Sequence, residues 1–138
     1  MFNNCYTLPG LNFAFPDVAL TPIPTPVGPI PVPLPYPNLG MNPMALPMTT
    51  AMHVFQTFTP AHNVVTSVPL SNGDNAGLMG GVTCPPMDMS FNFRVSCATS
   101  MLMGCLPVVR MVDMTLQNMW NSVGLTVAPS QVQTLVLR

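Results

Sequence analysis

The chain has 138 residues, enough for one domain, and only 5% of them are charged, compared with about a quarter in an average soluble protein. It contains no lysine or glutamate, and its three arginines are scattered. Binding to nucleic acid needs clustered basic residues, so this class of partner is excluded. A surface with so few charges predicts a subunit whose surface is largely covered by a partner protein.

The N-terminal segment, residues 1–15, has no basic region ahead of an apolar stretch, so we expect no secretory signal peptide. The protein is then expected in the cytoplasm after synthesis, and any export must use a machine that needs no signal. No uninterrupted apolar span reaches the ~20 residues that cross a membrane. The longest candidate, residues 95–109, is interrupted by Ser96 and Pro107, so the chain is not expected to be transmembrane.

Residues 16–40 form a proline-rich strap, and within it residues 21–37 carry proline at every second position, with one shift of phase at Gly28. Each proline fixes φ and removes a backbone donor, so the segment must be extended, near polyproline II or an edge strand. Apolar residues such as Ile30 and Val32 lie between the prolines, which favours a strap packed over the domain's own surface or over a partner. A stiff linker, or a proline-rich module that binds a groove in a partner, is the alternative. The strap prolines are Pro22, Pro24, Pro26, Pro29, Pro31, Pro33, Pro35 and Pro37.

Residues 41–138 alternate short apolar and β-branched runs with turn signals, which is typical of short strands. The runs 63–70, 90–95, 107–112 and 132–137 are predicted strands. Helical periodicity is weak, and residues 44–55 or 114–120 could form a turn or two at most. The chain is therefore predicted to be a single all-β domain of short strands with little or no helix.

The polar residues give no sign of catalysis. The four aspartates stand singly in turn-like contexts, without the spacing of an acid–base or nucleophilic site, so we expect no enzymatic activity. Arg110 and Asp113, three residues apart, are expected to form a structural ion pair or a turn cap. Cys5, Cys84, Cys97 and Cys105 contain no C-x-x-C pair and are expected as reduced thiols rather than a zinc-finger site.

Two motifs together resemble a known family. The first is Pro16-Asp17-Val18 followed by the proline strap, and the second is the core Pro107, Val108, Val109, Arg110 and Asp113, in which valines stand for both alanines of the family's Pro-Ala-Ala-Arg motif. Between them, Pro60-Ala61-His62-Asn63 and residues 71–77 are similar to the central part of the same group. In their order and spacing these segments resemble the PAAR-like spike-tip proteins of bacterial type VI secretion.

The resemblance implies a small cone of β-hairpins whose broad base docks on the blunt end of a trimeric valine-glycine repeat (VgrG) spike, with one tip per trimer. A single chain that meets a threefold surface is expected to present three faces that look alike. Such tips sharpen the spike for membrane puncture, often carry or escort an effector, and are exported by the machine into the target cell. In this division residues 41–138 form the β-rich cone.

The resemblance also implies a metal near the point, usually zinc held by histidines and a cysteine. His62, Cys84 and His53 are the candidate ligands, with Cys97 and Cys105 as further thiols. Gln117 stands where relatives could place a histidine, and glutamine is a poor zinc ligand. Zinc binding and a hydrogen-bonded loop role for His62 both remain open, and a small metal-dependent toxin that uses these three residues is an alternative function.

Overall fold

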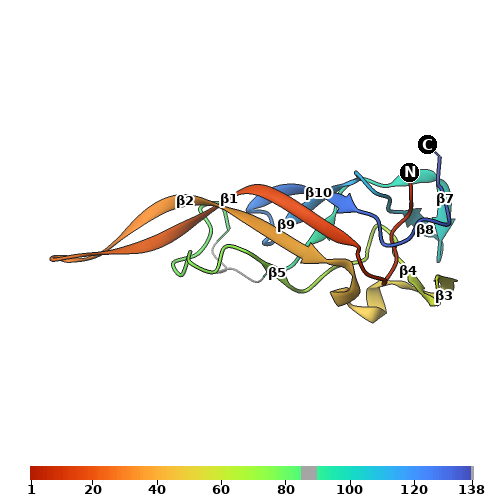
Figure 1. Cartoon of the computed structure of the whole chain (residues 1–138), viewed down its shortest axis with the longest axis horizontal. Helices are drawn as coiled ribbons and strands as arrows, with labels where there is room; N and C mark the ends of the chain where they lie inside the picture. The colour runs from red at the N-terminus through yellow and green to blue at the C-terminus, as the bar shows by residue number, and fades with distance from the viewer. Residues whose placement is uncertain (85–89, 138) are drawn as a thin grey trace.

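The computed structural model describes residues 1–84 and 90–137 as an elongated body that narrows from a broad end to a thin ribbon (Figure 1). The described residues contain strands and two short 3-10 helices but no α-helix, which confirms the all-β prediction. Six strands form one sheet in the order β5-β2-β1-β10-β9-β6, and β3–β4 and β7–β8 form two separate hairpins. The elements are β1 (Leu11–Thr25), β2 (Gly28–Met41), η1 (Asn42–Met44), η2 (Pro47–Thr49), β3 (Ala51–Gln56), β4 (Thr59–Ala61), β5 (Ser71–Asn72), β6 (Phe93–Arg94), β7 (Ala98–Met103), β8 (Leu106–Val108), β9 (Met114–Gln117) and β10 (Ser122–Ala128).

The narrow end is a two-stranded ribbon made by the distal parts of β1 and β2 (Figure 1). The two strands pair as far as Thr25↔Gly28, and Val27 in the turn is 98% exposed. Gly28 has φ +133°, a conformation that only glycine adopts readily. All prolines in the paired part of the ribbon occur at alternate register positions: Val18↔Pro35, Leu20↔Pro33, Pro22↔Pro31 and Pro24↔Pro29.

These proline positions are the ones whose backbone groups point away from the partner strand. The outward direction is visible at Leu20, whose N–H donates to the carbonyl of Gly80 (2.8 Å), and at Val18, whose carbonyl accepts from the N–H of Val82 (3.1 Å). A proline at such a position removes no hydrogen bond between β1 and β2, and it blunts the open edge of the ribbon. The alternation of prolines, with its phase shift at Gly28, therefore fits a hairpin.

The expectation that the strap packs over the domain's own surface is wrong for this distal part. Ile23 and Ile30 lie opposite each other in the ribbon and are 41% and 52% exposed. The strap is extended, as predicted, but its two halves pair with each other and project from the body. Because the prolines are held in a β-ribbon, they do not form the free polyproline II helix that proline-recognising grooves bind.

Two hairpins of the same design stand at the broad end (Figure 1). Both pair in the same register around one irregularity, β3–β4 from Ala51↔Ala61 to Gln56↔Thr59 and β7–β8 from Ala98↔Val108 to Met103↔Leu106. Both turns contain two residues with positive φ, which is the conformation that matches the twist of a tight hairpin. The turn residues are Thr57 (47°) and Phe58 (64°), and Gly104 (63°) and Cys105 (65°).

The two chain ends complete a third unit of this kind. Phe2 pairs with Leu135, and the amino group of Met1 donates to the carbonyl of Val136 (3.0 Å) while the N–H of Val136 donates to the carbonyl of Met1 (2.9 Å). Phe2 thus takes the place that Pro60 has in β3–β4 and Pro107 has in β7–β8. The termini lie where the other two units have their turns.

The inner segments of the three units pair with one another in a closed ring. In each segment two residues, separated by one, form the bridges to the two neighbouring segments. The bridges are Cys5↔Ala61, Asn63↔Val108 and Arg110↔Asn3. The second bridging residue of each segment meets the first bridging residue of the next, so the broad end has pseudo-threefold symmetry, as expected for three faces that look alike.

The six-stranded sheet has a polar inner face and an apolar outer face. Buried Arg94 donates to Asn12 Oδ1 (2.6 Å), Thr126 Oγ1 (3.1 Å) and Asn42 Oδ1 (2.6 Å), and burial lowers its pKa to about 10. The buried apolar cluster lies in the hairpins of the broad end instead, and consists of Ala51, Ala61, Ala98, Met103, Val108 and Val136. Hydrogen bonds thus stabilise the inner face of the sheet, and apolar packing stabilises the broad end, which we call the base.

Several predicted local elements differ from the structure. The runs 63–70 and 132–137 are largely irregular and contribute isolated bridges, while 90–95 contains β6 and 107–112 contains the end of β8. Residues 114–117 form β9 rather than a helical turn because they pair with β10 in the sheet. None of the helices in the described ranges is long and apolar enough to cross a membrane.

Candidate functional site

The centre of the ring is occupied by one residue from each segment: Asn4, His62 and Val109. All three side chains are fully buried, and two backbone bonds link them, from His62 N–H to the carbonyl of Asn4 and from Asn4 N–H to the carbonyl of Val109 (both 2.9 Å). The ring of Tyr6 meets the His62 imidazole edge to face, with centroids 5.6 Å apart. Burial, followed by the charge of Arg94, holds the pKa of His62 well below its usual 6.5, so this residue is a neutral part of the core.

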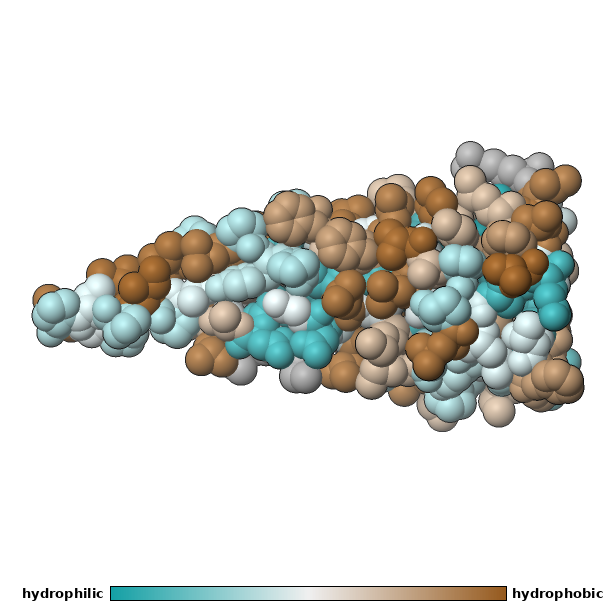
Figure 2. Space-filling model, viewed as in Figure 1, coloured by the Kyte–Doolittle hydropathy of each residue, from teal (hydrophilic) through white to brown (hydrophobic). Residues whose placement is uncertain are grey.

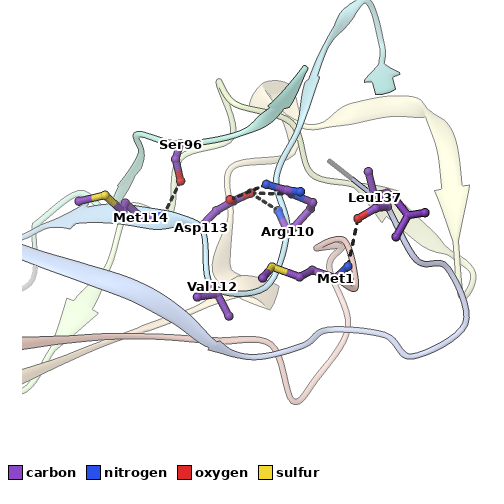
Figure 3. A pocket seen from close by; sticks show the side chains of 8 residues that line it. Met1, Ser96, Arg110, Val112, Asp113, Met114 and Leu137 are labelled. Carbon is purple, nitrogen blue, oxygen red and sulfur yellow. Dashed lines mark hydrogen bonds and ion pairs between the residues drawn. The ribbon is translucent and has the colours of Figure 1, made fainter. Parts of the chain in front are cut away.

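Arg110 and Asp113 form the expected ion pair beside the ring (Figure 3). Asp113 Oδ1 accepts from Arg110 Nη2 (3.2 Å), and Asp113 Oδ2 accepts from the backbone N–H of Arg110 (2.7 Å). Both side chains are at most 7% exposed. The intervening Val112 has φ +69°, a strained conformation for a β-branched residue. The motif therefore locks a tight turn that follows β8.

Three exposed apolar residues occupy equivalent positions in the three units. Phe55 lies opposite Pro60, Leu102 opposite Pro107 and Leu135 opposite Phe2. Their exposed fractions are nearly equal, at 65%, 60% and 60%. We call these residues the apolar triad of the base. Their equal exposure follows from the common register, and it gives the broad end three similar contact points.

Two surface pockets also lie at equivalent places, each between two neighbouring units. One of about 430 Å³ is lined by Met1, Arg110 and Val112 (Figure 3). The other, of about 360 Å³, is lined by the matching residues Leu106, Asn63 and Val65. The pseudo-threefold pattern thus extends from the backbone to the hollows of the surface.

The structure does not bring the three candidate metal ligands together. His62 is at the ring centre and His53 is on β3, next to the second pocket. Cys84 follows a segment that pairs with the middle of β1 through Gly81↔Ala19. In the described ranges no three His, Cys, Asp or Glu side chains cluster in a way that could hold a metal ion, and Cys97 and Cys105 are free thiols outside any such group. These residues do not fit a zinc ion.

Carboxylate–amide hydrogen bonds tie the loops together where the ribbon leaves the body. Buried Asp17 accepts from Asn38 Nδ2 (2.6 Å) and from Asn121 Nδ2, which joins β1, β2 and the loop before β10. Buried Asp74 accepts from Asn118 Nδ2 (2.6 Å), and Gln117 Nε2 donates to Thr115 Oγ1 (3.3 Å). The hydrogen bonds of Asp17 and Asp74 link segments far apart in the sequence, whereas that of Gln117 stays within β9.

Sequence reasoning identified the motif of the ring but missed the triad. Thr59-Pro60-Ala61-His62 and Leu106-Pro107-Val108-Val109 each follow a two-residue turn, and this local similarity was a usable signal for two of the units. The third unit offers no such signal, because its two strands come from opposite ends of the chain and its inner segment has Asn3 and Asn4 in place of apolar residues.

A family model described as the toxin PAAR-like domain matches residues 10–124, which is most of the chain. No curated protein and no solved structure matches.

Proposed function

This chain belongs to the toxin PAAR-like domain family, which indicates a role related to type VI secretion or toxins, and we propose that it caps a trimeric VgrG spike as its pointed tip. In this role one copy sits on one trimer and sharpens it for membrane puncture. The function is mechanical and involves no catalysis. The described aspartates support this, because each is buried and held by amide or guanidinium groups.

The observation that carries the proposal is the pseudo-threefold ring at the broad end. Three segments of one chain pair cyclically through three equivalent bridges, so a single polypeptide presents three similar surfaces. The fold of a single chain does not require such symmetry. Binding to a partner with true threefold symmetry does require it, because each of the three identical chains must contact a comparable surface.

The apolar triad supplies the contacts for this docking. Phe55, Leu102 and Leu135 are the most exposed apolar positions shared by the three units, and the burial of apolar surface is the main favourable term in most protein–protein association. The two equivalent hollows beside the ring can in turn receive side chains of the spike.

The narrow end supports the second half of the role. The body tapers to the β1–β2 ribbon, which projects away from the base (Figure 1). Prolines fix φ along both strands and reduce the freedom of the unfolded ribbon, which favours the extended, paired state. We further propose that the protein stays in the cytoplasm of the producing bacterium until the spike assembles. The machine then exports it into the target cell, with or without a separate effector.

The proposal is tested by co-purification with the VgrG trimer of the same source. The wild-type chain is expected to form a stable complex of one copy with three spike chains. Changing the triad to glutamates (F55E/L102E/L135E) is expected to abolish the complex, because three charges would lose their hydration on docking. A matched control, I23E/I30E, places charges on similarly exposed residues of the ribbon and should leave the complex intact. Failure of the wild-type chain to bind any co-encoded spike would contradict the proposal.

A further inference from the structure

Every charged side chain in the described part of the chain is buried. The exposed fractions are 0% for Asp17 and Asp74, 6% for Arg94 and Asp113, and 4% for Arg110. All of them are held from within by hydrogen bonds to the protein. Polar side chains on the described surface are therefore uncharged. This is the reverse of ordinary soluble proteins, which keep charges on the surface and apolar groups inside.

The outer face of the six-stranded sheet shows the same reversal. Phe13 is paired with both Leu39 and Leu125 across the sheet, and Leu125 is paired with Met114, so the row is apolar from β2 to β9. All four side chains are between 37% and 44% exposed. Figure 2 shows apolar side chains gathered over the middle of the body, between the ribbon and the broad end. The neighbouring rows continue this outer face with Phe15, Met41, Val123 and Val127, all of them exposed.

The distribution of charge decides which partner this face fits. A protein partner requires the loss of charge only at the centre of the contact, and the rim of such an interface normally stays polar and charged. Here side-chain charge is missing from the whole described surface, including parts that do not belong to the sheet. Because side-chain charge is absent from every side of the described surface, the surface fits a surrounding medium better than a single docked protein. Hydrocarbon is the medium in which an exposed charge is most unfavourable.

We propose that the outer face of the sheet is a lipid-contacting surface, which binds the hydrocarbon of a bilayer without help from charged headgroups. The burial of every described side-chain charge removes the largest penalty for contact between this face and hydrocarbon. The contact is distinct from docking on the spike, because the triad lies at the broad end and Met114 is the one member of the apolar row that also lines a described hollow. The two proposals can therefore fail independently.

The test is flotation of the full chain, alone and bound to its spike, with vesicles of phosphatidylcholine. Wild-type protein is expected to float with these neutral vesicles to the same extent at about 0.05 M and about 0.5 M salt, because no charge contributes to the contact. The variant F13K/L125K is expected to bind at least about tenfold more weakly, since lysine is excluded from hydrocarbon. The control L8K/L78K adds the same charge at two exposed positions outside the sheet, the triad and the hollows, and it should retain most of the binding.

Thermal unfolding and co-purification with the spike check that F13K/L125K remains folded and docks normally. Three outcomes would overturn the proposal: no flotation of the wild-type chain, flotation only with anionic vesicles, or equal binding by F13K/L125K and L8K/L78K. A co-produced protein that binds the wild-type chain and is lost only in F13K/L125K, in the absence of vesicle binding, would show that the face is a protein interface instead.

Discussion

At the scale of single residues, His62 shows how the centre of the base depends on a neutral imidazole. Its side chain is fully buried where the three inner segments meet, and neither ring nitrogen has a hydrogen-bond partner in the described residues. Burial first, and the charge of Arg94 second, lower its pKa well below 6.5. A charged His62 would therefore be unfavourable at the point where all three units meet.

The stability of the protein is expected to fall as the pH drops below the unfolded pKa of His62, near 6.5. In this range His62 binds a proton in the unfolded chain but not in the folded chain. The free energy of unfolding therefore falls by up to about 1.4 kcal/mol for each pH unit. H62N, which copies the equivalent Asn4, should flatten this dependence, whereas H53N should retain it. Urea unfolding between about pH 7 and about pH 5 measures the slope.

If H62N does not fold, the imidazole signals of wild-type His62 give the same information by nuclear magnetic resonance, because they should not titrate over this range. A wild-type stability that is unchanged from neutral to mildly acidic pH, or a His62 signal that titrates near 6.5, would contradict the role assigned to its burial.

At the scale of elements, the sequence predicted the extended conformation of the proline-rich segment but not the strand with which each half pairs. The prolines exclude helix and require an extended chain, which the structure confirms. Periodicity alone does not say what an extended segment pairs with, so the apolar residues favoured packing on the body. The informative signal was the phase shift at Gly28. A hairpin whose turn is Pro26-Val27, directly before this shift, turns the missing donors of both strands outward.

This register predicts opposite effects for two neighbouring substitutions in β2. Val32 lies opposite Thr21 at a position whose N–H points toward the partner strand, so V32P should remove a hydrogen bond of the ladder, worth ~1 kcal/mol, and open the distal ribbon. P31A restores an N–H that points outward and should leave the ribbon closed. Amide hydrogen exchange of Ile23 and Ile30 measures the difference, with faster exchange in V32P only. Equal exchange in both variants would show that the register is different.

At the scale of the whole molecule, the resemblance predicted a base with three similar faces, and the structure shows how one chain builds them. Two units are hairpins with tight turns, and the third joins the two ends of the chain. This third unit could not be predicted from local sequence, because Phe2 and Leu135 meet only when the rest of the fold has formed. The apolar triad was missed for the same reason, since its members become equivalent through pairing and not through a shared motif.

The separation of base and ribbon predicts that the β1–β2 ribbon can be shortened without loss of binding to the spike. Residues 22–31 pair only with each other, so their replacement by Asn-Gly, between Thr21 and Val32, should close a two-residue hairpin turn. The free energy of unfolding should change by less than about 0.5 kcal/mol, and co-purification with the spike should be unaffected. Delivery into target cells should fall, because a blunter end spreads the force of contraction over a larger area of membrane.

The full-length variant P24A/P29A, which keeps the ribbon, serves as the control. Normal delivery by the shortened protein would show that the ribbon is not the puncturing element, whereas loss of spike binding would show that base and ribbon are not independent.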